Sequence, residues 1–123
     1  MPFRHVVLLR WADDVPDHHL EQVRAGLDAL PTQIPQIRRF VHGSDVGVSE
    51  GNYDYVVVAD FDNVHDWRAF REHPAHLVFM AEHITGKFTD RAAIQYQTPA
   101  EGDPFDYSDA RIRALLAEPD ELT

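Results

Sequence analysis

The order of hydrophobic periodicities along the chain constrains its fold more than any other feature. Apolar residues alternate at every second position over residues 3–11 and 53–61, which is typical of β-strands. Residues 17–30 instead repeat apolar side chains at three- and four-residue steps, which is typical of a helix with one buried face. A weaker strand pattern covers residues 37–43, and a final one covers residues 87–96. These segments predict a mixture of strands and helices.

A helix interrupted by proline completes this pattern. Asn63 is a favourable N-cap, and apolar residues then follow helical spacing until Pro74, which cannot donate a backbone hydrogen bond. Helical spacing resumes from Ala75 to Ile84, so we expect a break at His73–Pro74. The predicted order is β-α-β-β-α-β, an α+β fold of ferredoxin-like topology in which an antiparallel sheet carries both helices on one face.

The composition of the chain changes after residue 97. Residues 1–97 hold all of the strands and helices described above. The chain is 44% hydrophobic, which is enough to form the buried core of one domain. Residues 98–104 are rich in proline, glycine and acidic side chains, and Ser108 is a favourable cap for a helix after them. We therefore expect a domain at residues 1–97, and a linker with a short C-terminal helix at residues 98–123.

The charge and the absence of cysteine exclude several classes of function. The chain has 11 basic and 21 acidic residues and a net charge of −10, which repels nucleic-acid phosphates and anionic membrane surfaces. No cysteine is present, which excludes disulfides and thiolate chemistry and makes a reducing cytoplasm the simplest location. No phosphate-binding loop or metal motif of good spacing occurs, so we expect neither a metal nor a cofactor.

The predicted sheet has an apolar side that the helices do not cover. Four apolar residues alternate with the helix-facing residues of their strands and so point to the other face of the sheet: Val6, Leu8, Val56 and Val58. A second sheet stacked on this side would remove these side chains from water. The sequence therefore predicts a homodimer that pairs through the faces of its sheets.

Two histidines and one tyrosine are the candidates for chemistry. His76 belongs to the sequence His73-Pro74-Ala75-His76 and can exchange a proton near neutral pH. Alternation turns His5 and Tyr55 toward the helices, where small-molecule pockets form. The alternative is structural, because a histidine beside a proline often caps a helix and a histidine on an apolar face is often a satisfied core residue.

We expect these three residues to line one apolar cavity. The same faces of the predicted strands and helices supply its candidate substrate-binding residues, for which simple core packing is the alternative: Val7, Leu9, Val23, Leu27, Val57, Ala59, Trp67, Phe70, His73, Leu77 and Met80.

Four groups of residues, in this order and spacing, resemble the stress-responsive A/B barrel (Dabb) family. They are the run Arg4–Leu9, the segment Leu30–Phe40 with Ile34-Pro35 inside it, Tyr53-Asp54-Tyr55, and His73-Pro74-Ala75-His76. The resemblance covers residues 3–96 and implies a dimeric α+β barrel, here with an extra C-terminal helical tail.

The resemblance also implies a candidate reaction. One plant member of the family is a polyketide cyclase, in which a histidine at the position of His76 is the base and a tyrosine stands at the position of Phe70. That cyclase also has a histidine at the position of Tyr55 and a tyrosine at the position of Leu27. The implied function is a cyclase, lyase or isomerase acting on a polyketide-like carbonyl compound. The alternative is a non-catalytic dimeric protein that serves in a stress response or binds a small apolar compound.

Overall fold

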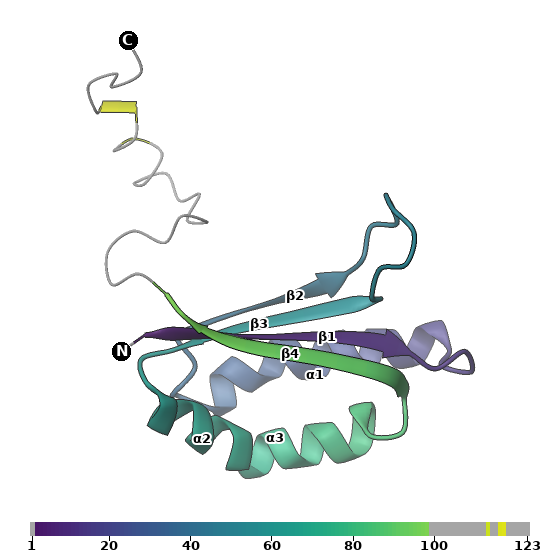
Figure 1. Cartoon of the computed structure of the whole chain (residues 1–123). Helices are drawn as coiled ribbons and strands as arrows, with labels where there is room; N and C mark the ends of the chain where they lie inside the picture. Colours follow the sequence, from purple (N-terminus) through teal and green to yellow (C-terminus); the bar gives the residue numbers. More distant parts are fainter. Residues whose placement is uncertain (1, 99–112, 114–115, 118–123) are drawn as a thin grey trace.

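A four-stranded antiparallel sheet carries helices on one face (Figure 1). The computed structural model describes residues 2–98, 113, 116 and 117. The strands lie in the order β2-β3-β1-β4, with the bounds β1 Phe3–Trp11, β2 Arg39–Ser44, β3 Tyr55–Phe61 and β4 Phe88–Gln97. The helices are α1 Asp17–Gln33, α2 Val64–Glu72, α3 Pro74–Phe79 and the π-helix η1 Met80–Ile84. The predicted ferredoxin-like α+β fold is thereby confirmed.

The central strand β1 brings together side chains from distant parts of the chain. His5 pairs with Ala59 of β3 on one side and with Gln95 of β4 on the other. Leu9 pairs with Tyr55 and Arg91 in the same two strands. Because paired residues point to the same face of an antiparallel sheet, the helix-facing side carries polar groups of β4 beside the histidine of β1.

Helix α1 ends later than the sequence predicts. The helical pattern of the sequence covers residues 17–30, but α1 continues past Pro31 to Gln33. Pro31 cannot donate to the carbonyl of Leu27, four residues before it, and its ring crowds that carbonyl. The backbone N–H of Ile34 still donates to the carbonyl of Leu30 at 2.9 Å, which closes the final turn.

The break between α2 and α3 lies at His73–Pro74, where the sequence predicts it. Asn63 caps α2 by accepting a hydrogen bond from the backbone N–H of Asp66 at 2.8 Å. Helix α3 then begins at Pro74. Proline is favourable at the first position of a helix, because the N–H that it lacks would have no partner within the helix. After Phe79 the hydrogen bonds of the π-helix span five residues, as the bond of 2.8 Å from the N–H of Thr85 to the carbonyl of Met80 shows, and Phe79 and Ile84 are the buried residues of α3 and η1.

The two faces of the sheet have different surroundings. The core lies between the sheet and the helices and includes Val23, Leu30, Ile34 and Phe61, each at most 2% exposed. On the opposite face, the predicted residues Val6, Leu8, Val56 and Val58 remain partly exposed. Beside them, Ile94 and Val41 are 59% and 44% exposed. An apolar surface is therefore left open on one side of the single chain.

The predicted linker and its cap at Ser108 lie outside the described residues. Of the terminal segment, Arg113, Leu116 and Ala117 are described and are helical. Within the described residues, no helix is long and apolar enough to cross a membrane.

Candidate functional site

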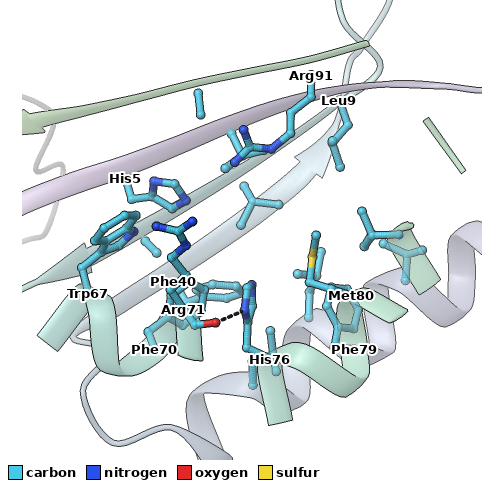
Figure 2. Close-up of a pocket in the computed structure, with 18 of the residues that line it drawn as sticks. His5, Leu9, Phe40, Trp67, Phe70, Arg71, His76, Phe79, Met80 and Arg91 are labelled. Carbon is cyan, nitrogen blue, oxygen red and sulfur yellow. Dashed lines mark hydrogen bonds between the residues drawn. The ribbon is translucent and has the colours of Figure 1, made fainter. Parts of the chain in front are cut away.

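A cavity of about 580 Å³ lies between the sheet and the helices (Figure 2). Eleven of the residues singled out in the sequence line it: His5, Val7, Leu9, Val23, Leu27, Val57, Ala59, Trp67, Phe70, His76 and Met80. The remaining lining residues were not singled out: Leu30, Phe40, Arg71, Phe79, Ile84, Arg91, Ala93 and Gln95. The volume falls within the range typical of small-molecule sites.

Tyr55 is buried on the helix-facing side, as its alternation predicts, but it does not line the cavity. Its hydroxyl donates to Nδ1 of His42 at 2.6 Å, and Nε2–H of His42 donates to a carboxylate oxygen of Asp28 at 2.6 Å. Burial raises the pKa of Tyr55 above its usual value. The expectation that Tyr55 lines the cavity is therefore wrong, because its hydroxyl bonds His42 of strand β2 instead.

His73 and Leu77 also lie away from the cavity. Nδ1 of His73 accepts the backbone N–H of Ala75 at 3.0 Å, so His73 caps α3. Leu77 is 54% exposed, which corrects its expected place in the pocket wall. The physical reason is the restart of the helix at Pro74, which turns Ala75 and Phe79 toward the core instead.

His5 is held as a neutral imidazole with a defined tautomer. Its side chain is buried, and the residue is only 7% exposed. The amide Nε2 of Gln95 donates to Nδ1 of His5 at 2.8 Å, which leaves the ring proton on Nε2. Burial, followed by the charges of Arg91 and His76, lowers the pKa of His5 to about 4. At neutral pH His5 can therefore donate a hydrogen bond but carries no charge.

His76 has the opposite tautomer. Its Nδ1–H donates to the backbone carbonyl of Arg71 at 3.0 Å, as the dashed line in Figure 2 marks, and this leaves the lone pair on Nε2. Burial is the main cause that lowers its pKa, against the opposing effect of the hydrogen bond to Arg71. A neutral imidazole with an open lone pair can accept a proton, so His76 has the properties of a general base.

The aromatic ring of Phe70 lies close to both histidines. Its centroid lies 4.4 Å from that of His76 and 6.5 Å from that of His5. A hydroxyl is absent at this position, so the ring contributes only apolar surface and exclusion of water. Trp67 completes the wall, with its ring 5.8 Å from His5. A proton acceptor and a neutral donor thus face one largely apolar cavity.

Three of the lining residues that the sequence analysis did not single out belong to strand β4. Arg91, Ala93 and Gln95 alternate along β4, so the sequence already places them on one face of that strand. Ile94 alternates with these residues and is apolar, as are the residues of the uncovered face. This would have indicated that Arg91, Ala93 and Gln95 point to the other face, toward the helices. Phe79 was overlooked because the helix restarts at Pro74, which places Ala75 and Phe79, four residues apart, on the side that faces the core. Within the described residues, no group of three or more histidine or acidic side chains could hold a metal ion.

Known proteins that resemble this chain share its ferredoxin-like fold. The family model "Stress responsive A/B Barrel Domain" matches residues 3–98. No curated protein matches the chain significantly. A dimeric ferredoxin-like protein of unknown function from Thermobifida fusca is 40% identical, with a TM-score of 0.74, over 79% of this chain and 91% of that one.

More distant structures share the same architecture. A dimeric protein of unknown function from Bacteroides fragilis is 25% identical, with a TM-score of 0.69, over 78% of this chain and 95% of that one. The hydroxynitrile lyase from Passiflora edulis is 19% identical, with a TM-score of 0.71, over 82% of this chain and 96% of that one, and this likeness concerns the fold alone. Since the family model spans most of the sequence, the chain belongs to the stress responsive A/B barrel domain (Dabb) family.

Proposed function

We propose that the cavity performs general-base chemistry on a small carbonyl compound, as in a cyclase, a lyase or an isomerase. The observation that carries this proposal is the opposite tautomers of His5 and His76 in one cavity. Nε2 of His76 would remove a proton from the carbon next to the carbonyl. The Nε2–H of His5 would donate to the carbonyl oxygen as negative charge develops on it.

A neutral pair of histidines suits this reaction. A protonated base would be inactive, and the pKa of His76 is lowered, so its lone pair is free at neutral pH. Protons that lie between two carbonyl groups, as in polyketide-like compounds, are acidic enough for an imidazole to remove. The resulting enolate could close a ring, shift a double bond or expel a leaving group, and the bound compound decides which.

We also infer that the chain works as a homodimer that pairs through the uncovered face of its sheet. The dimeric proteins from Thermobifida fusca and Bacteroides fragilis support this inference. Ile94, Val41 and Tyr96 are large apolar or aromatic side chains exposed at the edges of that face, and Val6 and Val58 lie between them. Stacking two such faces would bury them from water.

The reaction can be tested without knowing the natural substrate. Phenylacetone has activated protons next to a neutral ketone, and NMR can follow their exchange for deuterium in heavy water. His76→Ala should slow the protein-dependent exchange by roughly 10²- to 10⁴-fold, the usual range for a general base. The matched control is His65→Ala, an exposed histidine of α2 outside the cavity.

The pH dependence gives a second readout of the same base. Because the pKa of His76 is lowered, the acid limb of kcat/KM should lie below pH 6.5, the ordinary value for histidine. Exchange that is equal in the parent protein and in His76→Ala would refute the general base. Binding of phenylacetone with no protein-dependent exchange would favour the small-molecule-binding alternative instead.

A further inference from the structure

The cavity has hydrogen-bond donors concentrated around His5. The ring of Trp67 lies 5.8 Å from His5, and the guanidinium of Arg71 lies 5.5 Å from the centroid of the Trp67 ring. Arg91 is close enough for its charge to lower the pKa of His5. Figure 2 shows the Arg71 and Arg91 side chains, from helix α2 and strand β4, both extending toward His5. We call His5, Trp67, Arg71 and Arg91 the donor cluster.

Neither arginine of the donor cluster has an acidic partner among the described residues. Elsewhere Arg4 pairs with Asp60 at 2.8 Å and Arg38 pairs with Asp62 at 2.7 Å. In a chain with 21 acidic and 11 basic residues, carboxylates are abundant, yet no carboxylate forms an ion pair with Arg71 or Arg91 in the described part. Arg71 and Arg91 are exposed residues that line the cavity without a carboxylate partner in the described part, and they give one side of it a local positive charge within an acidic protein.

Trp67 adds an independent sign of a missing acceptor. Its indole Nε1–H is buried and has no hydrogen-bond partner among the described residues. A buried donor without an acceptor costs free energy, so such a group usually has a partner in the functional state. An oxygen-bearing ligand in the cavity would supply one.

Part of the cavity lining is apolar. Leu27, Leu30, Phe79 and Ile84 line the cavity and are at most 6% exposed. In Figure 2 the ring of His76 lies between the donor cluster and the side chains of Phe79 and Met80. A ligand that spans the cavity would therefore meet cationic donors at one end, His76 near its middle and hydrocarbon at the other end.

We propose that the cavity takes carboxylates with an apolar, ring-sized body, and that Arg71 and Arg91 bind the carboxylate. This inference rests on the proposed function, since it names the substrate class of the same cavity. Guanidinium groups bind carboxylates through paired, charge-assisted hydrogen bonds. The aromatic face of Trp67 holds the guanidinium of Arg71 by stacking, and its N–H edge stays available for the ligand.

An unreactive pair of ligands tests the anion site separately from the chemistry. Phenylpropionate and phenylpropionamide have the same shape, differ in charge and have no ketone, so their binding does not depend on a functional base. Isothermal titration calorimetry should find the carboxylate bound roughly ten- to a hundredfold more tightly than the amide, the range for charge-assisted hydrogen bonds. Added salt should reduce this preference.

Substitution of the two arginines completes the test. Arg71→Gln and Arg91→Gln should each reduce the preference for the carboxylate, and the double variant should remove it. Arg68→Gln is the matched control, since Arg68 is an exposed arginine of α2 that does not line the cavity. Equal binding of carboxylate and amide, no binding of either, or a preference that survives in the double variant would overturn the inference. Exchange of phenylacetone by the parent protein would still support the proposed function in each case.

Discussion

Gln95 Nε2 lies 2.8 Å from Nδ1 of His5, so a residue of the last strand sets the tautomer of a histidine on the first strand. The two residues are 90 positions apart in the chain, and the pairing of β1 with β4 places them side by side. This hydrogen bond requires a neutral His5, and it leaves Nε2–H as the donor that the proposed chemistry uses.

The lowered pKa of His5 predicts that acid destabilises the fold. Its pKa is about 4 in the folded state and 6.5 in the unfolded chain. Between these values the unfolded chain binds a proton that the folded chain does not, so the free energy of unfolding should fall as the pH drops from 6.5 toward 4. Urea unfolding at several pH values measures this slope. His5→Gln should flatten it, whereas His65→Gln, which alters an exposed residue, should not.

Removal of the hydroxyl of Tyr55 should affect stability rather than ligand binding. Tyr55→Phe leaves Nδ1 of the half-buried His42 without its donor and should cost about 1–3 kcal/mol in denaturant unfolding. Tyr53→Phe is the control, because the hydroxyl of Tyr53 bonds Asp90 at the surface, and its effect should be smaller. If Tyr55→Phe instead lost phenylacetone exchange while its stability was unchanged, Tyr55 would take part in the reaction, as the sequence analysis predicted.

The close approach of α1 and α3 depends on Gly26. A Cβ atom at this position would lie 2.7 Å from Cε2 and 2.8 Å from Cδ2 of Phe79, which lines the cavity. Although alanine favours helices by about 1 kcal/mol over glycine, Gly26→Ala should destabilise the protein by roughly 1–3 kcal/mol because of overpacking. Thermal unfolding measures the change.

A second substitution identifies the cause of that effect. Phe79→Leu removes the ring that the new methyl group would meet, so the double variant Gly26→Ala/Phe79→Leu should be more stable than additive effects predict. Additive losses in this double-mutant cycle would contradict the steric explanation.

The proposed dimer should depend on the uncovered face of the sheet. Ile94 is 59% exposed beside Val6, and Ile94→Asp would place a charge in the interface without disturbing the core. Sedimentation velocity should show a dimer for the parent protein and a monomer for the variant. Val48→Asp is the control, because Val48 is 84% exposed in the segment between β2 and β3 and should leave the dimer intact. A parent protein that sediments as a monomer at micromolar concentration would rule out this assembly.

Local patterns in the sequence determined most of the scaffold and one side of the site. Alternation along residues 3–11 turns His5 and Leu9 to the same face, and that depends only on the geometry of an extended backbone. Asn63 and Pro74 likewise act on the backbone within one helical turn, so the break before His76 could be predicted from residues next to it.

Only the tertiary structure decided which side chains meet across the cavity. The partners of Tyr55 and His5 come from β2 and β4, and no local pattern states the register in which distant strands pair. That register turns the hydroxyl of Tyr55 to His42 and brings Arg91 toward Arg71 beside His5. The periodicity of a segment depends on its own backbone, whereas the tautomers and charges of the cavity depend on contacts between segments far apart in the chain.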